Sequence, residues 1–141
     1  MSEKTRRDEI ICFARDIRNN WGTDPFDIAE RCGVVVVEAE SGEPTGATVR
    51  VPGYLTLITL SGCKTELAKR VICAHELGHA LLHDGMAINR FNGTSDSLQD
   101  QCEYEANLFA VALLVEDNAL NKPLKEMNNW MLKYILDYNV K

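Results

Sequence analysis

The stretch His75-Glu76-Leu77-Gly78-His79 is the feature that most constrains this chain of 141 residues. Two histidines four positions apart stack on one face of a helix, about one turn from each other. Neutral imidazoles placed in this way can share one metal ion, and Zn2+ is the usual occupant of such a site. The intervening Glu76 lies next to the metal, where it can take a proton from a metal-bound water. The pattern is typical of zinc-assisted peptide hydrolysis.

Residues 65–83 fit the helix that this pattern requires. Apolar or small side chains recur there at steps of four and three: Leu67, Val71, Ala74, Gly78 and Leu81. Both histidines lie beside this stripe, roughly 100° round the helix. Gly78 costs a helix about 1 kcal/mol relative to alanine, so we expect packing or access to the site to require it. The alternative is a helix with two histidines at its surface or at the edge of the core.

The composition is that of an ordinary globular protein, with 45% hydrophobic and 26% charged residues. We expect residues 1–141 to form a single domain, because this length is enough for one sizeable core. The net charge of −6 argues against direct binding to nucleic acid or to an anionic membrane. No apolar run approaches the roughly 20 residues that span a bilayer, and the N-terminus lacks the apolar core of a signal peptide. These features predict a cytoplasmic protein.

The cysteines are odd in number and widely spaced, and no C-x-x-C occurs. They are Cys12, Cys32, Cys63, Cys73 and Cys102. This pattern argues against a disulfide framework or a structural zinc knuckle, so we expect reduced, buried thiols. Cys73 and Cys102 are close to the candidate site in sequence, which leaves open a redox-sensitive thiol or a soft metal ligand.

Two helices are expected first. Thr5 and Asp8 form a capping box, and Gly22 ends the helix that follows. The apolar face of this helix comprises Ile10, Phe13, Ala14, Ile17 and Trp21. Asp24, followed by proline, is typical of the start of a second, short helix, and Gly33 stops it. We expect both helices to be core scaffold.

Three strands are expected next. The four valines of residues 34–37 predict the first, and residues 47–51 and 54–60 predict two more, joined by Pro52-Gly53. The fold class is therefore α+β, with a small antiparallel or mixed three-stranded sheet packed on a helical core. One edge of the sheet could pair with an extended peptide, or the sheet could only cover the helices.

Two long helices are predicted in the C-terminal half, over residues 98–116 and 124–140. The first has an apolar face made of Cys102, Ala106, Phe109, Ala110 and Leu113. The second carries a one-sided stripe, which we expect to pack in the core: Met127, Trp130, Met131, Tyr134, Ile135 and Tyr138. Residues 86–97 have no clear periodicity, and they could border a cleft or serve only as a connector.

A catalytic zinc keeps three protein ligands and one open position, so a third ligand is needed. The candidates are His83, Asp84, Asp96, Asp100, Cys102, Glu103 and Glu105. His83 lies about 6 Å beyond His79 along the helix, so we expect it to support the site or cap the helix. Glu103 and Glu105 flank the apolar stripe on opposite sides, and periodicity does not choose between them. Asn107, one turn after Glu103, could accept the free N–H of a liganding imidazole, which favours Glu103.

Residues 74–83 are AHELGHALLH and residues 103–114 are EYEANLFAVALL. Together they resemble the ImmA/IrrE family of metallopeptidases, and the resemblance extends from about residue 30 onward. It implies a gluzincin-like zinc site with His75, His79 and a glutamate as ligands and Glu76 as general base. In related gluzincins the ligand glutamate precedes an acidic or amide residue by four, which again favours Glu103.

Members of this family are typically bacterial or encoded on phages and other mobile elements, and they cleave helix-turn-helix repressors at specific sites. The resemblance therefore implies a zinc-dependent endopeptidase with a co-encoded repressor as substrate. The sequence departs from the family pattern after Leu114. A further donor to the oxyanion is expected among His83, Tyr54, Tyr104 and Arg90.

Two other functions remain open from the sequence. A protein with this fold could be catalytically weak or inactive and regulate a repressor by association. It could also be a different metal hydrolase, for example one that acts on a small amide. The intact set of His75, Glu76 and His79 argues against a binding protein, which has no need of Glu76.

Overall fold

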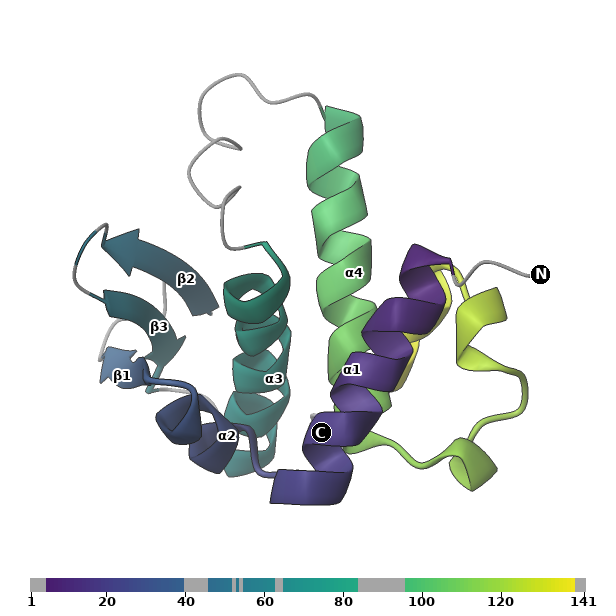
Figure 1. Cartoon of the computed structure of the whole chain (residues 1–141), viewed down its shortest axis with the longest axis horizontal. Helices are drawn as coiled ribbons and strands as arrows, with labels where there is room; N and C mark the ends of the chain where they lie inside the picture. The colour runs from purple at the N-terminus through teal and green to yellow at the C-terminus, as the bar shows by residue number, and fades with distance from the viewer. Residues whose placement is uncertain are drawn as a thin grey trace.

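The computed structural model of the protein describes residues 5–39, 46–51, 53, 55–62, 65–83 and 96–138. Its elements are α1 (Arg6–Trp21), α2 (Pro25–Arg31), β1 (Val34–Ala39), β2 (Gly46–Val51), β3 (Leu55–Ser61), α3 (Glu66–Leu82), α4 (Asp96–Leu114), the 3-10 turns η2 (Asp117–Ala119) and η3 (Leu124–Glu126), and α5 (Asn129–Tyr138). The sheet lies on one side of α3, and α4 and α1 lie on the other (Figure 1). The α+β class is confirmed. No helix in the described part of the chain is long and apolar enough to cross a membrane.

The first two helices begin and end as their sequences predict. The Thr5 hydroxyl accepts a hydrogen bond from the Asp8 backbone N–H at 3.1 Å, and the Asp8 carboxylate accepts one from the Thr5 N–H at 3.3 Å. Asp24 caps α2 through its side chain. Gly22 and Gly33 follow the two helices with φ of 90° and 77°, which glycine adopts without steric cost.

The sheet is mixed, with β3 between the two edge strands β1 and β2. β1 pairs with β3 in parallel, as Val36 does with Ile58, and β2 pairs with β3 antiparallel. Ile58 and Leu60 are buried in the core, whereas Val35 and Val37 are exposed. One face of the sheet is therefore covered by the helices. Gly53 turns the β2–β3 hairpin with φ of 80°.

Helix α4 passes through the centre of the protein. Its residues 104–113 are all buried, in contact with α1, α3 and α5. The sequence predicts one apolar face, but Val111 and Ala112, which lie off that face, are also fully buried. Over this stretch α4 is thus buried all round, with Glu105 and Asn107 as its buried polar side chains.

Helices α3 and α4 pack closely at Gly78. A Cβ atom there would lie 3.2 Å from both the Cα and the carbonyl oxygen of Ala106. It would also lie 3.3 Å from the Cβ of Phe109. Gly78 therefore has the packing reason that its place in a helix leads us to expect.

The prediction of one helix over residues 124–140 is wrong. The chain forms η3, leaves helical geometry at Met127 and Asn128, and then starts α5. Asn128 explains the break, because its side chain accepts a hydrogen bond from the Met131 backbone N–H at 2.9 Å. Asparagine is among the strongest helix N-caps, so it starts a new helix here.

The prediction that the aromatic stripe of this segment packs in the core is also wrong. Trp130, Tyr134 and Tyr138 are 71%, 58% and 65% exposed. Their rings stack in sequence, with centroids 5.7 Å and 6.3 Å apart. The buried face of α5 consists of Leu132 and Leu136, which contact the rest of the core. The helix has two apolar faces, and periodicity does not identify which of them the core covers.

The expectation of buried thiols holds for only part of the described chain. Cys73 is buried and Cys102 is half-buried, but Cys12 and Cys32 are exposed. Burial raises the pKa of Cys73 to about 12, so its thiol stays protonated at neutral pH. A thiolate ligand at Cys73 is therefore disfavoured. Cys63 lies outside the described residues.

Candidate metal centre

Helix α3 carries both histidines on the side that faces α4. Thr65 begins the helix by accepting a hydrogen bond from the Ala68 backbone N–H at 3.1 Å. One turn separates His75 from His79, and their ring centroids lie 4.8 Å apart at an interplanar angle of 87°. His79 is buried and His75 is half-buried. The two rings thus stand next to each other, as the spacing in sequence predicts.

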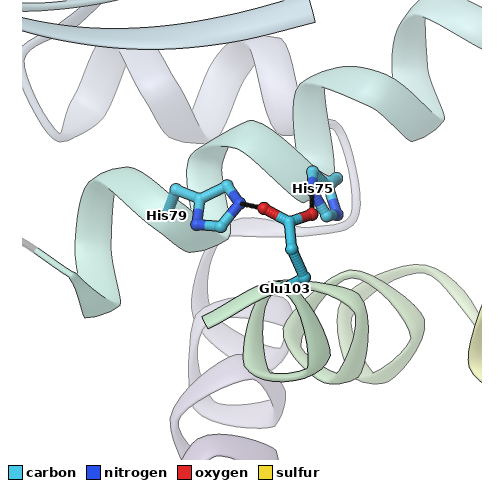
Figure 2. A group of neighbouring side chains, drawn as sticks. All are labelled: His75, His79 and Glu103. Carbon is cyan, nitrogen blue, oxygen red and sulfur yellow. Dashed lines mark hydrogen bonds and ion pairs between the residues drawn. The ribbon is translucent and has the colours of Figure 1, made fainter. Parts of the chain in front are cut away.

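Glu103 of α4 meets both rings. Its Oε1 lies 3.1 Å from Nε2 of His75 and its Oε2 lies 2.9 Å from Nε2 of His79, so the carboxylate lies between the imidazoles (Figure 2). The potential ligand atoms of the three side chains all lie within 4.8 Å of one another. Two imidazole nitrogens and a carboxylate oxygen are the donor set of a catalytic zinc site, with one position left for water. The residues present therefore fit such an ion.

Contacts within this group displace the pKa values of Glu103 and His75. Hydrogen bonds from His75 and His79 hold the pKa of Glu103 well below its usual range. Burial lowers the pKa of His75, but the hydrogen bond to Glu103 and the charges of Glu76 and Glu103 outweigh it, so the net shift is upward. Glu103 is therefore ionised where a cation would bind, and a ligating imidazole must first be neutral.

Asn107 contacts the other nitrogen of the His75 ring, with Oδ1 2.8 Å from Nδ1. Its amide nitrogen donates to Oδ1 of Asn129, on α5, at 2.7 Å. Because this second contact makes Asn107 Oδ1 the acceptor, Nδ1 of His75 donates to it, so a neutral His75 ring that keeps this bond would present an unprotonated Nε2 to a metal. Asn107 thus contacts the imidazole, as its spacing from Glu103 suggests, and α5 supports it.

His79 is held in the same way by a longer chain of contacts. Its Nδ1 lies 3.0 Å from Nδ1 of His83, whose Nε2 lies 3.0 Å from Oε1 of Glu105. Glu105 can only accept, so the His83 proton lies on Nε2 and its Nδ1 accepts from His79. Burial lowers the pKa of His83, which agrees with a neutral ring. His79 therefore also presents Nε2 toward Glu103.

Glu105 does not join the histidine pair. Arg6 of α1 donates to both of its carboxylate oxygens at 3.2 Å, and Gln101 donates to Oε2 at 2.8 Å. Burial raises the pKa of Glu105, but the hydrogen bonds from Arg6, Gln101 and His83 outweigh it and lower the pKa. Of the two glutamates that periodicity leaves open, the structure places Glu103 at the candidate metal centre and Glu105 behind His83.

The carboxylate of Glu76 lies against the edge strand β2. The Thr48 hydroxyl is 2.6 Å from Oε1 of Glu76 and 3.0 Å from its backbone carbonyl oxygen. At Gly46 a Cβ atom would overlap the side chain of Ile72 and lie 3.6 Å from Oε2 of Glu76. Arg50, further along β2, donates to the carbonyl of Ala80 at 3.0 Å. The strand is thus fixed to α3 on either side of Glu76.

A cleft of about 530 Å³ opens over these groups, lined by His75, Glu76 and Glu103 together with β2 and α5. Asp100 also lines it but does not belong to the donor group. Cys102 and His83 are not in that group either. The side chains of Asp84 and Asp96 lie outside the described residues.

Of the four predicted oxyanion donors, the structure describes only Tyr104 and His83. The Tyr104 hydroxyl donates to the backbone carbonyl of Met127 at 3.3 Å, and neither Tyr104 nor His83 lines the cleft. Tyr54 and Arg90 lie outside the described residues. Lys133 of α5 does line the cleft.

Several residues of this site have no signature in the sequence. Arg6, Thr48, Gln101 and Asn129 come from four different elements, and only the fold brings them to the site. Gln101 alone has a local indication, because it precedes Glu105 by one helical turn.

Comparison with known proteins gives three findings. The family model of the IrrE N-terminal-like domain (peptidase M78) matches residues 29–139. Metallopeptidase ImmA of Bacillus subtilis (strain 168) is 33% identical over 70 residues, which make up 50% of this chain and 41% of that relative. The chain thus spans about two fifths of the length of this curated relative. No solved structure matches the chain.

Proposed function

The chain belongs to the peptidase M78 family, which has the IrrE N-terminal-like domain, and on that premise we propose that it is a zinc-dependent endopeptidase. The proposed substrate is a helix-turn-helix transcriptional repressor of a phage or mobile element, cleaved at a specific site. The family is one of metallopeptidases, so it implies a metal ion and a protein substrate. The identities of the metal as zinc and of the substrate as a repressor are proposed beyond the family assignment.

The observation that supports this function most is the composition of the cleft. Three metal donors, His75, His79 and Glu103, converge within 4.8 Å, and Glu76 lines the same cleft as His75 and Glu103. A protein that only binds a metal or a partner has no use for a carboxylate at Glu76. A hydrolase needs it as the base that activates water.

When bound, zinc would supply a Lewis acid for the scissile carbonyl and lower the pKa of the attacking water toward about 7. Glu76 takes a proton from that water and passes it to the leaving amine. The hydrogen bond from Thr48 fixes one carboxylate oxygen of Glu76, so that the other can accept the proton. Asn107 and His83 keep the two ligand imidazoles in the tautomer that presents Nε2.

The substrate side of the proposal is supported by the edge strand and by the family resemblance. β2 lies at the edge of the sheet beside Glu76, where an extended peptide can add as a further strand. The net charge of −6 favours a protein substrate over direct contact with DNA. The helix-turn-helix repressor follows from the resemblance of residues 74–83 and 103–114 to the ImmA/IrrE family.

The test uses the repressor encoded beside this protein, incubated with the purified protein with and without zinc and followed by intact mass. We expect cleavage at one site that requires zinc. Glu76→Gln should retain zinc but lose roughly 10²–10⁴-fold in rate, the usual contribution of a general base. Glu66→Gln, which changes an exposed glutamate in the first turn of the same helix, is the matched control.

Retained cleavage by Glu76→Gln contradicts the mechanism. Repressor binding without cleavage, in a zinc-free protein and unaffected by a chelator, supports regulation by association instead.

A further inference from the structure

Helix α5 lines two different hollows with two of its faces. Polar side chains of α5 line the metal cleft: Asn129, Lys133 and Asp137. The aromatic side chains of α5 line a second, larger groove of about 1000 Å³: Trp130, Tyr134 and Tyr138. We call this second hollow the aromatic groove. Helix α3 and residues 114–122 form its other walls.

The aromatic groove adjoins the metal cleft. Val71 of α3 and Leu136 of α5 line both hollows, so these two buried side chains form a wall that the cleft and the groove share. On the wall opposite α5, Leu67 is 43% exposed at the beginning of α3. A polypeptide bound at Glu76 therefore lies next to the groove and would enter it by crossing this shared wall.

The walls of the groove are mostly apolar, with polar side chains such as Arg70, Glu116 and Lys122 among them. Trp130 and Tyr134 are exposed, and their rings stack at 5.7 Å with an interplanar angle of only 13°. Contiguous exposed apolar surface of this kind is rare unless it contacts a partner. Tryptophan and tyrosine also offer a large contact area at a low cost in conformational entropy.

The dimensions of the aromatic strip correspond to a short peptide. Trp130 and Tyr138 are two helical turns apart, which is about 12 Å along the axis of α5. An extended chain rises about 3.3 Å per residue, so about four residues cover this length. Such a segment would continue from the residues held at the metal cleft.

We propose that the aromatic groove binds a segment of the substrate polypeptide beside the scissile bond, about four residues long and bearing aliphatic or aromatic side chains. Trp130, Tyr134 and Leu67 then determine which polypeptides are cut. The inference rests on the proposed function for the cleavage itself, but the binding of such a segment can be measured without cleavage.

The test is a selection of random 16-residue peptides on the zinc-loaded Glu76→Gln protein, which leaves bound peptides intact. The recovered peptides should share a run of about four apolar residues, and their affinity is then measured by fluorescence anisotropy. W130S/Y134S in the same background should bind them at least tenfold more weakly. Trp21→Ser, which changes a half-exposed tryptophan outside the groove, is the matched control and should bind as the parent does.

Leu67→Ser changes the opposite wall of the groove and should weaken peptide binding in the same way. Because Leu67 is on α3, this result could not come from a local folding defect of α5. Equal affinity in the W130S/Y134S variant, recovered peptides without an apolar run, or a selection that recovers none would each overturn the inference. A dimer of the parent protein that W130S/Y134S converts to monomer would also overturn it, because the groove would then be occupied by a second copy. If zinc-loaded wild-type protein binds these peptides but cuts neither them nor the repressor, the proposed function fails while the groove stands.

Discussion

Helices α4 and α5 both carry apolar side chains on more than one face, and the protein covers them differently. Phe109 of α4 is fully buried, with its ring centroid 6.0 Å from that of Phe13. Trp130 of α5 is a larger side chain, yet 71% of it is exposed. Charged groups follow the same division, since Glu105 is buried among partners and Asp117, which follows α4, is exposed. Helices α3 and α4 carry the three side chains of the candidate metal centre, whereas α5 leaves its aromatic side chains exposed.

The largest expected difference between these regions is in stability. Phe109→Ala should lower the free energy of unfolding by about 3–5 kcal/mol, because it leaves a cavity in the core. Trp130→Ala removes more atoms but should change it by less than about 0.5 kcal/mol, since they are mostly in water. Urea denaturation of the metal-free variants measures both. Comparable losses of unfolding free energy in the two variants would mean that Trp130 is covered in solution, and the contrast between α4 and α5 would then be wrong.

Metal affinity should separate the two glutamates of α4. Glu103→Ala removes a proposed ligand, so we expect zinc to bind more than roughly 100-fold more weakly. Glu105→Gln acts only through His83 and should cost about 10–100-fold, as is usual for groups behind a ligand. Competition with a chromophoric chelator measures both affinities. A larger loss of zinc affinity in Glu105→Gln than in Glu103→Ala would indicate that Glu105 is the ligand and would contradict the proposed metal centre.

Gly78→Ala tests how closely α3 and α4 must pack. Alanine favours a helix by about 1 kcal/mol over glycine, but the added methyl group meets the Ala106 backbone at 3.2 Å. Overpacking typically costs about 1–3 kcal/mol, so after the gain in helix propensity we expect a net loss of stability of up to about 2 kcal/mol. Zinc affinity should also fall, because Glu103 lies on the helix that is pushed away. A stabilised variant with unchanged zinc affinity would show that α3 and α4 accommodate the added methyl group without strain.

The smallest effect is expected at Asp117, which is exposed at the start of η2 after α4. Hydrogen bonds from Arg15 at 2.7 Å and 2.8 Å hold the pKa of Asp117 below its ordinary value. A lowered pKa in the folded state stabilises the protein above the ordinary pKa of about 3.9, and this contribution is lost as the pH falls through the lowered value. Solvent screens the pair, so Asp117→Asn should cost about 0–1 kcal/mol at neutral pH. Thermal melts should show that the difference narrows in acid, and a difference that grows instead would reverse the assigned sign.

Local sequence was sufficient for most of the fold. The capping box at Thr5, the cap at Asp24 and the turn at Gly53 act within a few residues, so each could be located from its neighbours alone. The broken helix at Asn128 was missed because an asparagine inside an apolar pattern resembles any polar surface position. The sequence likewise left the direction of strand pairing open, since it depends on which distant strand is adjacent.

The candidate site divides in the same way. The spacing of His75 and His79 places both rings on one helix face, which any helix would do. The meeting of Glu103 with these rings depends on how α3 packs against α4, and spacing alone favoured it only through Asn107. The sequence does not identify Arg6 and Thr48 as part of the site. Their partners, Glu105 and Glu76, are on distant elements, and no regular spacing links the positions.

The order of strands in the sheet has a consequence for the way the protein folds. Val49 and Leu57 are paired across a short hairpin, whereas Val34 must reach Thr56 across the whole of β2. Closing the shorter loop costs less chain entropy, so we expect the β2–β3 hairpin to form before β1 joins it. The strand that carries Thr48 would then be in place early, and the last event would be the arrival of a parallel strand on the far edge. The slow phase of refolding should therefore be the pairing of β1 with β3, after the hairpin that carries Thr48 has formed.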